Sequence, residues 1–147
     1  MTSLDQAETD LRRATSLAPR HAAAWSDLAH AIELRAFAEP ARVRDLAEGA
    51  VAAANHAVRL GAVVPEFWIR LGLALDMQAR RREGTNAFEN AVKLAPQSSQ
   101  AWYYYAHHLS LATEDREPAL RAIAKCLSLD PGNPAAEALR VKLNGRS

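Results

Sequence analysis

The residues that could carry out catalysis or bind a metal are a single cysteine and five histidines. Cys126 stands where a helix would place a small core residue, and burial keeps a thiol unreactive. His107 and His108 are adjacent, so on a helix their side chains diverge by about 100° and cannot share one metal ion. The remaining histidines lack ligand spacing, and no glycine-rich phosphate loop is present. We therefore predict no enzymatic activity, no metal site and no cofactor.

Recognition of a partner is the other chemistry that the residue types favour. Tyrosine and arginine often carry the binding energy of an interface, because they are large or planar and can also hydrogen-bond. Three tyrosines occupy 103–105, and Arg70 lies in an apolar stretch. We expect Tyr105 to point into the core. A platform for single-stranded nucleic acid would also need a basic groove.

Charge and composition exclude several classes of protein. The chain has 18 Lys and Arg against 17 Asp and Glu, a net charge of +1, so we predict no nucleic-acid partner. The cluster 80–82 of three arginines is interpreted as an exposed, solvated turn. The start of the chain lacks the basic and apolar runs of a signal peptide, and no stretch approaches the length of a membrane span. One cysteine excludes an internal disulfide and favours a reducing, cytoplasmic location.

The elements that must position these residues are helices arranged in repeats. Apolar residues recur at helical spacing along the whole chain, which at 147 residues can bury one core as a single domain, 1–147. The clearest unit runs from Trp68 through Leu71-Gly72 and Leu75, and then through Gly84, Phe88 and Ala91 to Pro96. Trp102 follows Trp68 by one period (102 − 68 = 34), and Trp25 precedes it by a longer one (68 − 25 = 43).

This pattern resembles the tetratricopeptide repeat, a helix–turn–helix of about 34 residues. The resemblance implies an all-α fold, a right-handed superhelical solenoid. It predicts five parts: an N-terminal half repeat (3–21), a repeat with an extended turn and second helix (22–64), two regular repeats (65–98 and 99–133), and a C-terminal capping helix (134–144).

Two features depart from a regular array. The first repeat exceeds the period by nine residues (43 − 34) around 37–46, which we interpret as a longer second helix and a longer turn. The N-terminal half repeat should begin with a capping box of Ser3 and Gln6 and bury a stripe that contains Leu4, Leu11 and Leu17. It is interpreted either as a natural cap or cut end of a longer array, or as a docking surface for a homo-oligomer.

The resemblance also implies a concave groove, lined by the first helix of each repeat, that receives an extended peptide or a partner helix. The helical wheel turns one set of side chains toward it. The residues that we predict to contact a partner are Asp27, His30, Glu66, Ile69, Arg70, Tyr103, Tyr104 and His107. The same side of the wheel carries Ser26, Glu33, Leu73, Asp76, Gln100 and Ser110. We expect a ligand with one carboxylate near Arg70, an apolar anchor near Tyr103 and Tyr104, and a basic residue toward Asp27 and Glu33.

One subgroup of the family holds the acidic C-terminal peptide of heat-shock chaperones with lysine, asparagine and arginine side chains. The matching positions here are Ser26, His30, Arg70, Gln100 and Tyr104. Only one of these is a cation, so a double carboxylate clamp is not expected. The predicted function is a protein–protein interaction module, acting as an adaptor, a scaffold or a chaperone-like protein. The alternative is a structural self-assembly unit, or the repeat region of a larger enzyme.

Overall fold

The computed structural model describes residues 2–112 and 114–145. These contain helices and no strand, which confirms the all-α prediction. The elements in chain order are α1 (Ser3–Leu17), α2 (Ala22–Ala38), the 3₁₀ helix η1 (Pro40–Arg42), α3 (Val43–Leu60), α4 (Pro65–Met77), α5 (Arg81–Leu94), α6 (Ser99–Ser110), α7 (Glu117–Leu129) and α8 (Pro134–Asn144). No described helix has both the length and the apolar character that a bilayer span requires.

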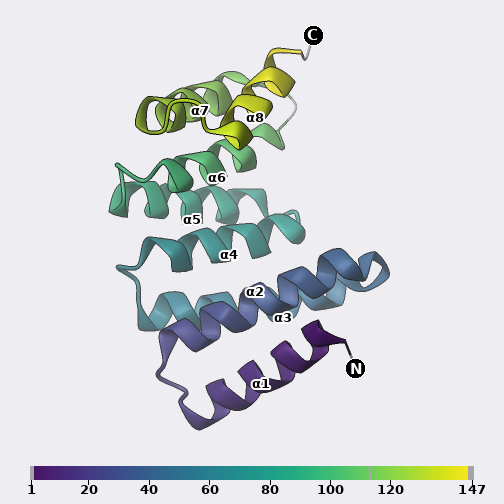
Figure 1. The fold of residues 1–147 in the computed structure, drawn as a ribbon. Coiled ribbons are helices and arrows are strands. Elements are labelled where there is room, and N and C mark those ends of the chain that lie inside the picture. The colour runs from purple at the N-terminus through teal and green to yellow at the C-terminus, as the bar shows by residue number, and fades with distance from the viewer. Residues whose placement is uncertain (1, 113, 146–147) are drawn as a thin grey trace.

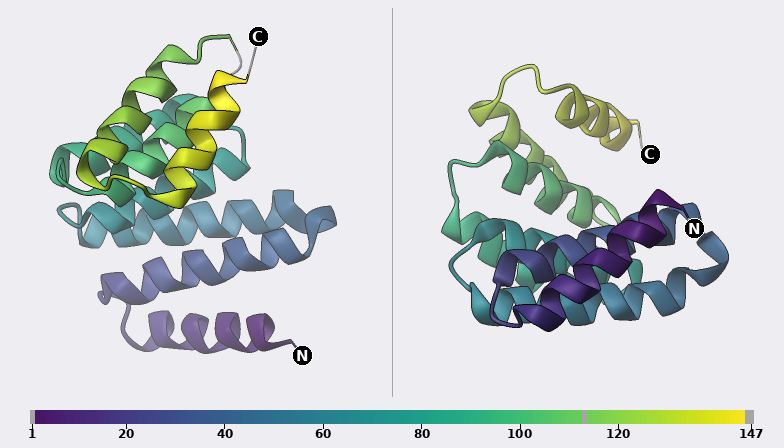
Figure 2. Two further views of the ribbon diagram at one scale, coloured as in Figure 1. Left: turned by 45° about the horizontal axis from the view of Figure 1, so that its top comes forward. Right: turned by 60° about the horizontal axis from the view of Figure 1, so that its bottom comes forward.

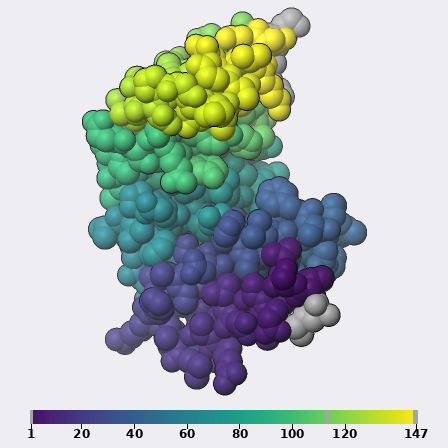
Figure 3. Space-filling view, viewed as in Figure 1, coloured from purple at the N-terminus to yellow at the C-terminus, as the bar shows by residue number. Residues whose placement is uncertain are grey.

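The helices stack in chain order into a solenoid, as predicted (Figure 1). Each helix packs on the next, and the alternate helices α2, α4, α6 and α8 also contact one another in that order. Figures 2 and 3 show the purple α1 at one end of the stack and the yellow α8 at the other. The alternate helices therefore form a continuous surface, although most contacts are between neighbours in the sequence.

The first repeat divides its extra residues differently from the prediction. Both of its helices are long: α2 has 17 residues and α3 has 18, against 13 in α4 and 14 in α5. The turn between them consists only of Glu39 and η1. Pro40 accounts for this break, because the residue before a proline is forced out of the α region, and Glu39 has φ −125° and ψ 68°. The α2–α3 hairpin consequently projects past the end of α4 and α5 (Figure 1).

The N-terminal helix also differs from the prediction in two details. Its capping box is formed by Thr2 and Asp5, one residue before the predicted pair. Its buried side chains are Glu8 and Thr15, whereas Leu17 is 74% exposed. The face of α1 that packs on the next helix is thus partly polar.

That polar contact centres on Arg35 of α2. Its guanidinium forms ion pairs with Glu8 and, at 3.4 Å, with Asp5 of α1, and with Glu39, next to the end of its own helix, at 3.2 Å. Leu11 adds an apolar contact to the core. The first helix is therefore attached by ion pairs as well as by an apolar contact.

Each of the three tryptophans ties the first helix of its repeat to the turn before it. Each indole N–H donates to the carbonyl six residues earlier, in the turn before its helix. The bonds join Trp25 to Pro19 (2.9 Å), Trp68 to Ala62 (2.7 Å) and Trp102 to Pro96 (2.9 Å). Ala62 stands where the other two turns have a proline, and the bond still forms because it requires only a carbonyl oxygen.

Gly72 permits a close approach between α4 and the Phe88 side chain of α5. A Cβ atom at this position would lie 2.6 Å from two ring atoms of Phe88, which is fully buried. Any larger residue in α4 would therefore force α5 away from it.

Candidate functional site

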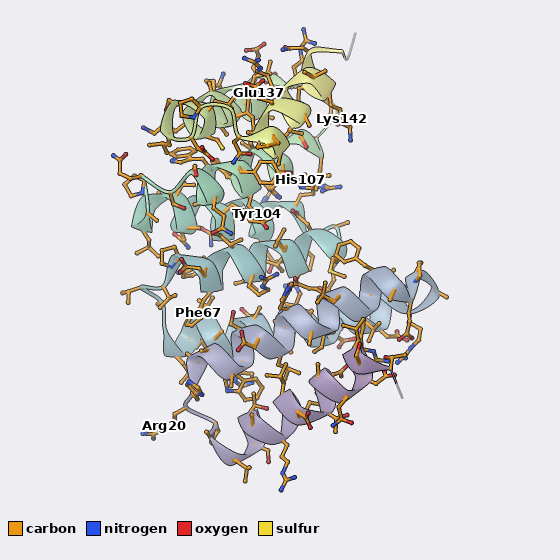
Figure 4. The ribbon with its side chains drawn as sticks, viewed as in Figure 1. Arg20, Phe67, Tyr104, His107, Glu137 and Lys142 are labelled. Atoms are coloured by element: carbon orange, nitrogen blue, oxygen red, sulfur yellow. The ribbon has the colours of Figure 1, made fainter. Side chains whose placement is uncertain are left out.

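A cavity of about 380 Å³ opens on the surface formed by α2, α4 and α6. We call it the groove cavity. Its lining residues are His30, Glu33, Leu34, Phe37, Arg70, Leu73, Asp76, Met77, Tyr104, His107 and Leu111. Figure 4 shows Tyr104 and His107 on α6, with the labelled residues of α8 beyond them. Three helices separated in the sequence thus build one concave site.

Four of the residues predicted to contact a partner line this cavity: His30, Arg70, Tyr104 and His107. Asp27 and Glu66 are exposed but lie outside it. Each precedes a lining residue by one helical turn, His30 in α2 and Arg70 in α4, so they continue the same surface toward the helix N-termini.

The other two predicted contact residues lie elsewhere. Tyr103 is half-buried; it packs edge-on against Tyr104, with ring centroids 5.5 Å apart, and against the core formed by α6, α7 and α8. Ile69 is only 6% exposed and belongs to a core cluster with Phe88 and Ala101. Its side chain is therefore not available to a partner, because α4 packs this part of its surface on α5 and α6.

Four apolar lining residues were not predicted. Leu34 and Phe37 are exposed at the C-terminal end of α2, and Met77 and Leu111 are half-buried at the ends of α4 and α6. All lie one or two helical turns beyond a predicted contact residue. Leu34 and Phe37 follow His30 by four and seven residues, whereas Met77 follows Arg70 and Leu111 follows Tyr104 by seven. Extending the same helical period would have found them.

An ion pair forms the polar floor of the cavity. Arg70 donates to Glu33 Oε2 at 2.7 Å, linking α4 to α2. The Glu33 side chain is 4% exposed, and its Oε1 has no hydrogen-bond partner among the described residues. Burial raises the pKa of Glu33 to about 7, against the opposing effect of Arg70. The arginine is therefore already engaged, and a ligand carboxylate would have to compete with Glu33 for it.

The two histidines of the cavity favour their neutral form. Burial lowers the pKa of His30, and the charge of Arg70 adds to that effect. Burial likewise lowers the pKa of His107, although Asp76 opposes it. Both rings can therefore donate and accept hydrogen bonds near neutral pH without adding net charge.

Comparison with known proteins identifies the fold. No protein-family model and no curated protein matches the sequence. The crystal structure of TTC0263, a thermophilic TPR protein of Thermus thermophilus, superposes with a TM-score of 0.80 over 96% of this chain and 71% of that chain, at 18% identity. The crystal structure of MamA superposes with a TM-score of 0.72 over 98% of this chain and 90% of that chain, at 17% identity. This chain has a tetratricopeptide-repeat (TPR) fold. At these identities the likeness shows the fold alone.

Within the TPR fold, a buried polar chain next to the groove cavity links three helices. His108 of α6 bonds through Nδ1 to Asp76 of α4 and through Nε2 to the Thr85 hydroxyl of α5, both at 2.7 Å. Gly84 makes room for it, since a Cβ there would lie 3.0 Å from the His108 ring. The Thr85 hydroxyl also lies 3.0 Å from the Arg81 carbonyl, within hydrogen-bond distance.

No group of three or more His, Cys, Asp or Glu side chains within 2–112 and 114–145 has an arrangement that could hold a metal ion. Cys126 is buried, and burial raises the pKa of its thiol. The side chains of the cavity are suited to binding: an apolar wall at one end and hydrogen-bonding groups along the floor.

Proposed function

We propose that this TPR-fold chain is a protein-interaction module that binds a peptide or a partner helix of another protein in the groove cavity. The observation that carries the proposal is the exposed apolar wall of Leu34 and Phe37 beside a floor of paired charges. Concave sites with apolar walls and a few placed polar groups are where proteins most often bind ligands. Adaptor, scaffold and chaperone-like roles would all use this chemistry.

The apolar wall favours a ligand that buries a large side chain. Phe37 is 75% exposed and Leu34 is 41% exposed, so both lose apolar area to a bound segment. Leu73, Met77 and Leu111 complete the wall from the other two helices. A partner helix or an extended segment would cross these three helices, since neither shape needs a closed pocket.

The test is selection of binding peptides, followed by comparison of two aspartate variants. Peptides from a random displayed library are selected on the intact chain, and their affinities for the wild type, Phe37→Asp and Val63→Asp are measured by fluorescence anisotropy. Val63 is 77% exposed and lies outside the groove cavity, so it matches Phe37 in exposure. We expect Phe37→Asp to weaken binding about tenfold or more and Val63→Asp to leave it unchanged. Equal affinity for all three folded proteins would refute the groove as the binding surface.

A further inference from the structure

We infer that the groove selects a partner segment that carries a large apolar residue and, about 10–15 Å away along the groove, a lysine or arginine. This inference rests on the proposed function and adds the chemistry of the ligand. It places the anchor at the C-terminal ends of the groove helices and the cation at their N-terminal ends.

The apolar end is formed by residues at corresponding places in three helices. Leu34 and Phe37 end α2, Leu73 and Met77 end α4, and Leu111 follows the last residue of α6. The half-exposed or exposed state of these side chains leaves apolar surface that no other described part of the chain covers. One large aliphatic or aromatic side chain of the ligand would bury that surface.

The acidic end carries two exposed carboxylates, Asp27 and Glu66. Neither side chain forms a hydrogen bond or ion pair with other residues within 2–112 and 114–145. Asp27 precedes Leu34 by seven residues, and Glu66 precedes Leu73 by seven. At the rise of an α-helix, each carboxylate thus lies about 10 Å from the start of the apolar end and about 15 Å from Phe37 or Met77.

The charged groups between these ends contact one another. Arg70 forms an ion pair with Glu33, and the Asp76 carboxylate hydrogen-bonds with His108 and lies 4.0 Å from Arg81. His30 and His107 favour the neutral form. The uncompensated charge on the α2–α4 side of the groove is therefore negative, which attracts a cation and repels an acidic segment. Lys142 of α8 adds a positive charge near His107, at the α6 side of the groove cavity.

The experiment compares peptides selected on three intact proteins from one displayed library of random peptides about 20 residues long, which accommodates both helical and extended spacings. The proteins are the wild type, the double variant Asp27→Lys/Glu66→Lys, and the control Glu48→Lys/Glu114→Lys. The control makes the same change of charge at exposed carboxylates outside the groove cavity. Circular dichroism verifies that all three are folded.

We expect wild type and control to select an apolar residue with a lysine or arginine at the stated separation. The groove double variant should lose that cation preference, and wild-type-selected peptides should bind it about two- to tenfold more weakly, the effect of one or two exposed ion pairs. The inference is overturned in either of two cases in which Phe37→Asp still weakens binding: the selected peptides lack the cation, or the double variant selects the cation as strongly as the wild type does. If Phe37→Asp leaves the binding of all selected peptides unchanged, the proposed function itself fails.

Discussion

Glu33 is the residue whose surroundings depart most from those of an ordinary surface carboxylate. Its side chain is almost wholly buried, it has one guanidinium partner, and one of its oxygens has no hydrogen-bond partner among the described residues. The pKa of about 7, against an ordinary value of 4.5, shows that the loss of water outweighs the attraction of Arg70. A salt bridge at this depth is thus a poor source of stability.

The stability of the chain should consequently depend on pH through Glu33. Because its folded-state pKa is raised, the folded state binds more protons than the unfolded state between pH 4.5 and about 7. The favourable contribution is fully present below pH 4.5 and is lost as the pH rises through about 7. As the pH rises across this interval, we expect the free energy of unfolding of the wild type to fall by on the order of 3 kcal/mol relative to that of Glu33→Gln.

Urea unfolding of both proteins at several pH values measures this difference. The comparison cancels the titration of histidines and other carboxylates, which are common to the two proteins. Parallel stability curves for the wild type and Glu33→Gln would contradict a raised pKa.

At the scale of the element, two helical glycines differ in how closely the neighbouring helix packs against them. Gly72→Ala would place a methyl group 2.6 Å from the buried ring of Phe88, and we expect a loss of about 1–3 kcal/mol or more from overpacking. Gly49→Ala, also inside a helix, would place its methyl group 3.7 Å from Ile32. That is ordinary contact, so the better helix propensity of alanine should stabilise the protein by about 0.5–1 kcal/mol. Thermal unfolding of both variants measures these effects. If both substitutions stabilised the protein, or both destabilised it, the packing described around the two glycines would be wrong.

The attachment of α1 is a second prediction at this scale. Arg35→Met leaves the buried Glu8 carboxylate without its partner in α2, and we expect α1 to open more easily, by about 1–3 kcal/mol. Hydrogen exchange should then rise in α1 and remain slow in α4 and α5. Arg42→Met is the control, since Arg42 pairs only with the partly exposed Glu39 among the described residues. Unchanged protection of α1 in Arg35→Met would show that apolar contacts suffice to hold it.

At the scale of the whole molecule, the hydrophobic core is divided into clusters along the stack of helices. One cluster joins α2 and α3 to α4 and α5, a second joins α6, α7 and α8, and a smaller one around Phe88 bridges them. Such a chain behaves as a row of neighbouring units, and its ends can open separately.

Matched core substitutions test that division. Ile123 in α7 and Ile32 in α2 are both 1% exposed, and replacement of either by alanine should cost about 2–5 kcal/mol. We expect Ile123→Ala to accelerate hydrogen exchange chiefly in α6–α8, and Ile32→Ala chiefly in α1–α3. A uniform increase along the chain in both variants would instead show one cooperative unit.

The sequence by itself determined the all-α repeat architecture and the helices that form the groove. These properties depend on helical period and on recurring residues such as Trp68 and Trp102, which are local features of the chain. The sequence could also have predicted the apolar end of the groove, because Phe37, Met77 and Leu111 lie on the groove side of their helices at the same helical period.

Only the tertiary structure decided which groove residues meet. Arg70 pairs with Glu33 across 37 residues, and His108 with Asp76 across 32. Ile69 is buried although the wheel turned it toward the groove. A wheel gives the direction of a side chain relative to its own axis, whereas these contacts depend on the rotation and tilt of each helix against its neighbours. The packing of α4 on α2 and on α6 therefore decides which of these groove charges meet a partner within the chain.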